Sequence, residues 1–287
     1  MAFRRTVIKN YYYLTKPGII YGNALTTIAG FLLACGFHVD IKLFLATIFG
    51  SSFIIASACV INNYVDRDID RVMERTKGRA LVVGAIDIRK ALVYSGVLLI
   101  LGCLLLILFV NLLVLAIGLI AFFIYLVPYA YYKRHSVHGT IVGSLAGAAP
   151  ILAGYCAVSG KLDLTATILF VIMLLWQMPH FYSIAIYRIK EYRAAGLPVL
   201  PVKKGIPETK RQILIYIGLF IAANIALSIF GPTGLIYAAV MSLVGLYWLR
   251  LGLRQTTDNK KWARKMFLTS LEVVLVLSVM LSIGSII

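Results

Sequence analysis

Nine runs of apolar residues, separated by polar segments, dominate the sequence. A helix needs about 20 apolar residues to cross a bilayer, so each run predicts one transmembrane helix. With 61% hydrophobic and 14% charged residues, the composition excludes an ordinary soluble domain. We therefore predict an all-α, polytopic membrane protein. The expected spans cover residues 18–37, 43–64, 91–110, 112–131, 140–159, 164–186, 212–230, 233–249 and 267–286.

The basic residues are distributed unevenly between the two sides of these spans. Of the 28 lysines and arginines, all but Lys42 and Lys161 fall on the side that contains the N-terminus. Short loops rich in lysine and arginine stay in the cytoplasm. This rule predicts a cytoplasmic N-terminus and, after an odd number of crossings, a periplasmic C-terminus. Membrane topology and phosphate binding thus explain the net charge of +17, and no nucleic-acid partner is expected.

The loops on the basic side are longer than those on the other side. Residues 65–90 and 187–211 form the two longest, whereas a connection on the opposite side, such as 231–234, has only a few residues. Binding and catalytic residues concentrate in long loops held by a rigid scaffold. We therefore predict a single transmembrane domain over residues 1–287, with its active site at these two cytoplasmic loops.

A row of oxygen-bearing side chains marks the end of the second span. Asn62, Asp66 and Asp70 recur every four residues, a spacing that places them along one face of a helix. Acids so close to each other and to a helix C-terminus are unfavourable unless a cation compensates them. Such oxygen ligands suit Mg²⁺, which often bridges carboxylates to a substrate phosphate. We therefore expect these three residues to bind Mg²⁺ beside a diphosphate.

Arginines accompany the acids at the same interval of four residues. Guanidinium groups bind phosphate oxygens through paired hydrogen bonds, so this series is expected to hold a leaving diphosphate. The series consists of Arg67, Arg71, Arg75 and Arg79. The alternative is a solvated helix whose i,i+3 ion pairs, such as Asp68 with Arg71, have only a structural role.

The segment from Asn62 to Asp70 resembles the N-x-x-x-D-x-x-x-D motif of the intramembrane aromatic prenyltransferases, which make quinones and prenylated haem. Further segments along nearly the whole chain are similar to the haem O synthases of that superfamily. These segments are Asp68-Ile69-Asp70 with Met73, Arg75-Thr76 and Arg79, then Lys133-Arg134-His135, Trp176-Gln177-Met178-Pro179-His180, and Glu191 to Val202. The resemblance also implies nine helices.

The resemblance implies transfer of a farnesyl group from farnesyl diphosphate to a vinyl group of protoheme IX, giving haem O for terminal oxidases. Asp66, Asp70, Arg67 and Arg71 would carry the catalysis, with Mg²⁺ as the cofactor. The enzyme would lie in the bacterial inner membrane with its active site facing the cytoplasm. Its partners would be the two substrates, the lipid bilayer and, as a further expectation, a haem A synthase or a terminal oxidase assembly.

The sequence departs from the family pattern in its second acidic segment. Glu191 stands where an aspartate is usual, and no second acid follows four residues later, so the number of bound metals stays open. Lys190, Lys203 and Lys204 flank Glu191, and the resemblance implies that these four residues help to bind the diphosphate. Glu191 is equally consistent with an ordinary interfacial acid paired with Lys190 or Arg188.

Three residues are candidates for contact with haem. His180 and His135 lie near the expected cytoplasmic ends of spans, and Trp176 precedes His180 by about one helical turn. A lone interfacial histidine is more often a hydrogen-bonded or solvated side chain than an iron ligand. The resemblance favours His180 as the haem-binding residue.

Two other functions are consistent with parts of this pattern. A prenyltransferase acting on a quinone precursor or another aromatic acceptor would share the metal motif, and the segment from Trp176 to His180 would distinguish the two. A secondary transporter would place ionisable residues within its spans. Here the acids cluster at span ends, except for Glu272, which we expect to be buried against a partner or near the interface.

Overall fold

The structure is a computed structural model that describes residues 2–36, 38–254 and 256–284, with side chains from Val7 onward. Within these residues it contains helices and turns but no strand. Nine segments of this part of the chain are long and apolar enough to cross a membrane, which confirms the all-α, polytopic fold class.

Seven of the nine spans are single helices in the described chain. They are α2 (Pro17–Cys35), α3 (Ile41–Val65), α5 (Ile88–Phe109), α10 (Leu164–Tyr187), α13 (Gly205–Phe230), α14 (Leu235–Leu253) and α15 (Asn259–Ile283). Four short helices lie outside the spans: α1 (Ala2–Leu14), α4 (Arg67–Val72), α11 (Ile189–Ala194) and α12 (Leu200–Lys203).

The other two spans are each divided into a pair of helices. α6 (Leu112–Leu126) and α7 (Pro128–His135) form one, and α8 (Gly139–Gly147) and α9 (Ala149–Ser159) form the other. A proline occupies one of the first two positions of α7 and of α9. Proline is tolerated there because the first N–H groups of a helix have no intrahelical acceptor.

Two helices begin well before the apolar runs that predicted them. α13 begins at Gly205 and α15 at Asn259, whereas the runs begin at 212 and 267. The early turns of these helices are charged, with Glu208, Lys210 and Arg211 in α13 and four lysines and arginines before Met266 in α15, and charged residues lower the hydropathy of a window. The expected span ends at Phe37 and at residues 285–286 lie outside the described residues.

The expected burial of Glu272 against a partner is not found in the described chain, because its side chain is exposed on the surface of the protein. Glu272 lies about halfway along α15, a few residues into the apolar run that follows the basic first turns of this helix. Buried neighbours such as Val273 and Val274 turn inward instead. A burial prediction from hydropathy failed here because the apolar run does not reveal which face of a helix meets the bundle.

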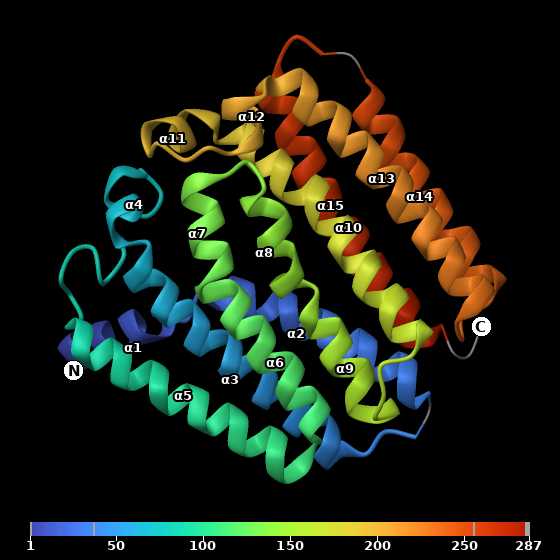
Figure 1. Cartoon of the computed structure of the whole chain (residues 1–287), viewed down its shortest axis with the longest axis horizontal. Coiled ribbons are helices and arrows are strands. Elements are labelled where there is room, and N and C mark those ends of the chain that lie inside the picture. Colours follow the sequence, from blue (N-terminus) through green and yellow to red (C-terminus); the bar gives the residue numbers. More distant parts are fainter. Residues whose placement is uncertain (1, 37, 255, 285–287) are drawn as a thin grey trace.

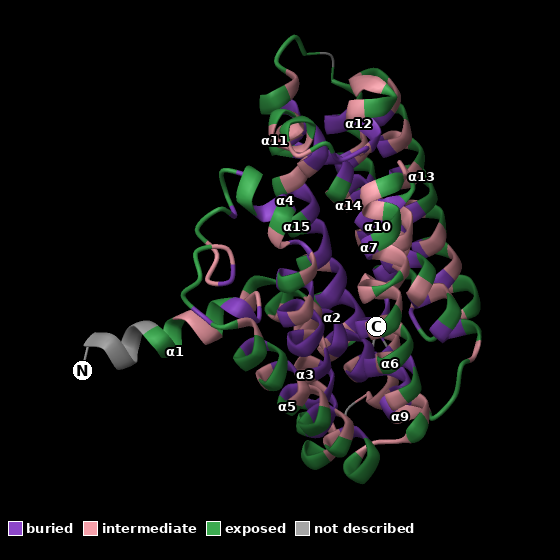
Figure 2. Ribbon diagram, turned by 60° about the vertical axis from the view of Figure 1, so that its left-hand side comes forward, coloured by how far each residue is buried: buried purple, intermediate pink, exposed green. Residues whose placement is uncertain are grey.

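The helices lie side by side, and α4, α11 and α12 gather at one end of the bundle (Figure 1). We call this the basic end; it comprises residues 66–87, 136–138, 188–204 and 256–258. Apolar side chains such as Val93, Val97 and Ile100 of α5 are exposed on the outer faces of helices, while buried positions line the interior (Figure 2). An apolar exterior of this kind is expected for a protein that lies in a bilayer.

Close helix contacts depend on glycine at two positions. A Cβ atom on Gly30 of α2 would lie 2.2 Å from the carbonyl oxygen of Ile151, and one on Gly154 of α9 would lie 2.0 Å from that of Thr27. Small residues allow such approaches in membranes, where packing rather than hydrophobic burial drives helix association. The α2–α9 contact fixes the position of α2, and Lys16, just before α2, reaches the site described next.

Candidate active site

Asn62, Asp66 and Asp70 lie on one buried face where α3 passes into α4, as their spacing predicts. The Asp66 N–H donates to the Asn62 carbonyl oxygen at 2.9 Å, and the Asp70 N–H donates to the Asp66 carbonyl oxygen at 2.8 Å. Helical hydrogen bonds thus connect the three residues although α3 ends at Val65. Each of the three is only 3% exposed. We call this row the α3–α4 oxygen stripe.

A different cation contacts each member of the stripe. The Lys16 ammonium donates to Asn62 Oδ1. Lys133 Nζ lies 2.6 Å from Asp66 Oδ2, and Arg79 Nη1 lies 2.5 Å from Asp70 Oδ2. These cations come from the segment before α2, from α7 and from the loop after α4. The protein itself therefore supplies the positive charge that the acidic stripe requires.

Lys16 is held in an unusual backbone conformation. Its φ of 55° lies in the left-handed region, which costs a non-glycine residue roughly 1–2 kcal/mol. Burial lowers the pKa of Lys16 to about 8. Strain of this kind persists only where surrounding contacts fix the residue, so the position of this ammonium group is set by the fold.

The stripe has the donor set for a hard divalent cation. Asp66 Oδ1 is buried and accepts no hydrogen bond from the described residues; the nearest recorded cation, Arg134 Nη2, is 3.8 Å away. The stripe offers two carboxylates and one amide oxygen, which are ligands that Mg²⁺ prefers. Among residues 7–284 as described, no three His, Cys, Asp or Glu side chains form a metal-binding group, so Asn62 would have to complete the set.

The i,i+3 ion-pair ladder does not form in the described chain. Asp68 instead accepts two hydrogen bonds from Arg134 of α7, at 2.6 and 2.8 Å. These bonds hold the pKa of the Asp68 carboxyl well below its usual range. Glu74 pairs with Lys77 at 2.8 Å. Of the arginines that accompany these acids in sequence, only Arg79 pairs with one of them in the described chain, namely Asp70.

The four arginines of the sequence series divide between two places. Arg79 contacts the stripe, and Arg75 is near Arg79 and Arg188. Burial lowers the pKa of Arg75, and the charges of those two arginines lower it further. Arg67 and Arg71 line a separate pocket on the exposed side of the same segment. A helix turns about 100° per residue, so side chains one position after the acids face a different direction.

Glu191 pairs with an arginine of its own segment. Arg188 Nη1 lies 2.7 Å from Glu191 Oε1, which agrees with the ion-pair interpretation. Glu191 Oε2, however, is buried and without a hydrogen-bond partner in the described chain. The flanking cations are exposed and form no ion pair there; they are Lys190, Lys203 and Lys204.

A small apolar cluster joins the two loops of the basic end. Ile69 and Met73, which lie on either side of Asp70 in sequence, pack against Leu197 of the second loop, and Tyr192 adds to the cluster. This contact places Arg188 and Glu191 on the same side of the bundle as the stripe. It is separate from the apolar core between the helices.

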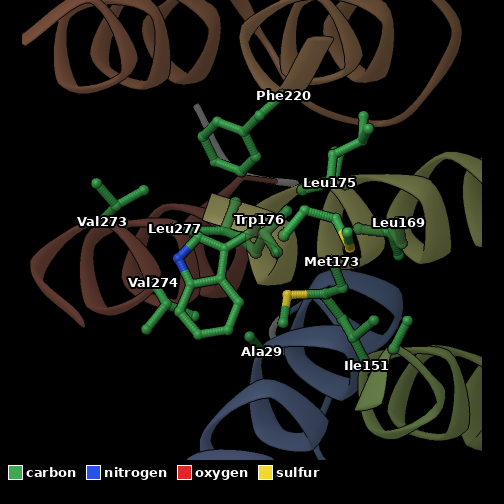
Figure 3. Packing of buried hydrophobic residues seen from close by; sticks show 14 of the residues in the cluster. Ala29, Ile151, Leu169, Met173, Leu175, Trp176, Phe220, Val273, Val274 and Leu277 are labelled. Atoms are coloured by element: carbon green, nitrogen blue, oxygen red, sulfur yellow. The ribbon is translucent and has the colours of Figure 1, made fainter. Parts of the chain in front are cut away.

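His180 and Trp176 converge on α15. Trp176 Nε1 donates to the Ser270 carbonyl oxygen at 2.8 Å, and His180 Nδ1 lies 2.7 Å from Ser270 Oγ. Their rings stack with centroids 4.9 Å apart. Trp176 packs in the core near Val273, Val274 and Leu277 of α15 (Figure 3). His180 is half-buried, whereas the residues just before it, including Trp176, are buried.

His135 has different surroundings from His180. It lies at the end of α7, is exposed, and contacts the Tyr131 carbonyl oxygen through Nδ1 at 2.8 Å. Its ring stacks on Tyr131 with centroids 4.5 Å apart. The structure therefore brings Trp176 and His180 together but leaves His135 on another helix.

Sequence reasoning missed several residues of the site. Lys16 and Lys133 contact stripe residues 46 and 67 positions away, so only the folded chain brings them together. Tyr125 and Tyr129 stack at 5.3 Å between ring centroids, and Lys133 Nζ lies 5.9 Å from the Tyr129 centroid. The available signal was the recurrence of Tyr125, Tyr129 and Lys133 every four residues along one helix face.

Comparison with known proteins identifies the group to which this architecture belongs. A UbiA prenyltransferase family profile matches residues 23–271. A "Protoheme IX farnesyltransferase" of Yersinia enterocolitica is 50% identical over 280 residues, covering 96% of this chain and 95% of the relative. The protein of that name from Klebsiella pneumoniae is 49% identical over the same shares.

Solved structures agree with this grouping. A digeranylgeranylglyceryl phosphate synthase superimposes with a TM-score of 0.79 and 26% identity, covering 97% of this chain and 98% of the other. A UbiA homologue from Archaeoglobus fulgidus, bound to DMAPP and Mg²⁺, has a TM-score of 0.75 at 17% identity, covering 92% and 99%; at that identity it supports the fold alone. From the extent of the profile and the identity to these relatives, the chain belongs to the UbiA prenyltransferase family.

Proposed function

We propose that this protein transfers the farnesyl group of farnesyl diphosphate to a vinyl group of protoheme IX, giving haem O. The observation that carries the proposal is 50% identity, over nearly the whole chain, to proteins named for that activity. The buried α3–α4 oxygen stripe with its three cations supports it, because a diphosphate leaving group requires concentrated positive charge.

Asn62, Asp66 and Asp70 would hold Mg²⁺, with Asp66 Oδ1 as the free buried oxygen. When bound, Mg²⁺ neutralises charge that builds on the departing diphosphate. Lys16, Arg79 and Lys133 already lie at these oxygens, so their ammonium and guanidinium groups are placed to donate to the diphosphate as well. Asp66 and Asp70 are the residues on which the site depends most.

Further cations of the basic end would act around this centre. Arg75 and Arg188 lie on the side of Glu191 and would bind the far end of the diphosphate. Exposed cations at the same end would raise the local concentration of the anionic substrate. The exposed cations are Arg71, Lys190, Lys203 and Lys204, and Arg67 is half-buried beside Arg71.

The faces of Tyr125 and Tyr129 would border the reacting allylic group. Their stacked rings lie beside Lys133, which itself contacts Asp66. The face of an aromatic ring attracts positive charge. As the carbon–oxygen bond to the diphosphate lengthens, the farnesyl carbon becomes cationic, and these rings would stabilise it until the haem vinyl group supplies electrons. Water would then add to the cation left on the porphyrin side and lose a proton, which gives the hydroxyl group of the product.

Trp176 and His180 would form part of the haem pocket. Ser270 Oγ is the hydrogen-bond partner of His180 Nδ1. The described residues provide no hydrogen bond to Nε2, so that nitrogen would be available to bind iron. Because Ser270 Oγ itself donates to the Phe267 carbonyl oxygen at 2.5 Å, the serine is oriented to fix the ring of His180. His135 remains the second candidate.

We further propose that the chain is one domain in the bacterial inner membrane, with the N-terminus and the basic end in the cytoplasm and the C-terminus in the periplasm. The concentration of lysine and arginine at one end supports this orientation. The product would pass to a haem A synthase or a terminal oxidase assembly.

The direct test supplies the purified, membrane-reconstituted protein with farnesyl diphosphate, protoheme IX and Mg²⁺, and identifies products by mass spectrometry. We expect a haem product carrying the farnesyl chain and a hydroxyl group. Transfer only to a quinone precursor would mean that this precursor, and not haem, is the acceptor. Absence of any transfer would reject the proposal that the protein is a prenyltransferase.

The haem contact needs a separate measurement. We expect His180→Ala to change the absorption spectrum and weaken the binding of haem added without farnesyl diphosphate, while His135→Ala leaves both unchanged. The reverse pattern would assign haem to the α7 side.

A further inference from the structure

A second pocket lies at the basic end, on the exposed side of the segment that carries the oxygen stripe. It has a volume of about 290 Å³ and is lined by Tyr64, Val65, Arg67, Asp68 and Arg71. The stripe residues Asn62, Asp66 and Asp70 are not among its lining residues. The pocket is therefore distinct from the centre to which the proposed reaction belongs.

The charges of this pocket are unbalanced. Asp68 is its one acid, and hydrogen bonds from Arg134 occupy both carboxylate oxygens. Arg67 lies over the Tyr64 ring, 5.8 Å from its centroid. Neither Arg67 nor Arg71 forms an ion pair with any described residue. Two guanidinium groups without a carboxylate partner face one hollow, a pattern suited to phosphate oxygens.

The position of the pocket indicates where the phosphate comes from. Tyr64 belongs to the last turn of α3, so the pocket begins where a transmembrane span ends. Exposed rings flank this level, namely Tyr64 itself and Tyr131 of α7, the helix that also provides Arg134. Exposed tyrosines at span ends are typical of the headgroup layer, and basic pockets at that depth bind anionic lipid headgroups.

The lining also argues against a second substrate site. Val65 is the one aliphatic side chain among the five lining residues, so the pocket offers no apolar channel for a prenyl chain. A phospholipid needs none, because its acyl chains stay in the bilayer beside the helices. Phe123 and Val127 of the α6–α7 span are exposed to that region, below Tyr131.

We propose that this pocket binds the phosphate of an anionic phospholipid through Arg67 and Arg71, while Arg134 neutralises the Asp68 carboxylate in the lining. The lipid would pin the start of α4, and with it the stripe, to the membrane surface. This inference does not depend on which acceptor the enzyme prenylates.

The test uses the full-length protein, delipidated in detergent and titrated with phosphatidylglycerol or phosphatidylcholine, with bound lipid counted by native mass spectrometry. We expect the wild type to bind phosphatidylglycerol about tenfold or more tightly than phosphatidylcholine. Arg67→Gln/Arg71→Gln should lose that preference. Lys203→Gln/Lys204→Gln removes the same charge elsewhere on the basic end and should keep it.

Four results would overturn the proposal. Equal loss of the phosphatidylglycerol preference in both glutamine double variants would mean that the preference reflects the total positive charge and not this pocket. Displacement of phosphatidylglycerol by farnesyl diphosphate at micromolar concentration would assign the pocket to the substrate. Displacement by inorganic phosphate alone would assign it to free anions. Arg67→Lys/Arg71→Lys, which keeps the charge, should bind with intermediate affinity; binding as weak as that of the glutamine variant at an unchanged melting temperature would contradict the phosphate contact.

Discussion

The two acidic segments of the basic end are built differently. In the α3–α4 oxygen stripe, three buried oxygen-bearing side chains each meet a cation from a different part of the chain. In the second segment, Glu191 meets Arg188 three residues away, and the pair is about a quarter exposed. The first is a tertiary site and the second a local ion pair. The comparison supports the proposal that the charges used in catalysis are concentrated at the stripe.

Removal of the divalent metal should have the largest effect on prenyl transfer, and it tests whether the stripe is a metal site. We expect chelation of divalent ions to abolish prenyl transfer, and added Mg²⁺ to restore it, because two carboxylates and a diphosphate require a hard cation between them. Ca²⁺, which prefers more ligands and longer distances, should restore much less. Activity that persists in excess chelator would contradict the stripe as a metal site.

Substitution of the stripe acids should have the second-largest effect on the transfer rate. Asp66→Asn or Asp70→Asn should lower the transfer rate by about 10²–10³-fold, the range for loss of one charge-stabilising group. Asp68→Asn is the matched control, since it lies between the two but is largely exposed and paired with Arg134. Steady-state rates at equal protein levels measure the difference; equal losses in all three variants would remove the distinction between the two faces.

The stripe cations can be tested through stability. Lys133→Gln leaves Asp66 buried without its partner, a change that costs about 3–5 kcal/mol and should lower the melting temperature by about 5–10 °C in metal-free buffer. Mg²⁺ should reduce this deficit, because it supplies the charge that the lysine provided. A deficit that is the same with and without Mg²⁺ would mean that metal and lysine do not share Asp66.

The smallest effect should come from the second segment. Glu191→Gln removes one partner of a partly exposed pair, worth about 1 kcal/mol or less, so the rate should fall less than about tenfold. Kinetics at several Mg²⁺ concentrations provide the measurement. A loss as large as that of Asp66→Asn, accompanied by a higher Mg²⁺ requirement, would make Glu191 a second metal ligand.

The periodicities of the sequence predict much of this molecule. Apolar runs predict the nine spans, and the spacing of Asn62, Asp66 and Asp70 predicts their common face. The same four-residue interval grouped Arg67 and Arg71 with the acids, although an offset of one residue rotates them away. Helical geometry alone could have separated these arginines from the stripe.

The rest of the site depends on contacts between distant residues. Lys16 reaches Asn62 across 46 residues, and His180 reaches Ser270 across 90. No local pattern in one sequence specifies such pairs, because they follow from how the helices pack. The early starts of α13 and α15 were missed for another reason: their charged early turns are helical but not apolar.

The cluster of Ile69, Met73 and Leu197 is an apolar contact between the two loops of the basic end. Each buried side chain of this type contributes about 1.5–3 kcal/mol, and the cluster is separate from the core that holds the helices. The two loops can therefore part as one cooperative unit while the bundle stays folded. Amide hydrogens around residues 69–76 and 192–199 should accordingly exchange with solvent together, and sooner than those of α3 and α10; such an opening would let a bulky product leave without unfolding a membrane span.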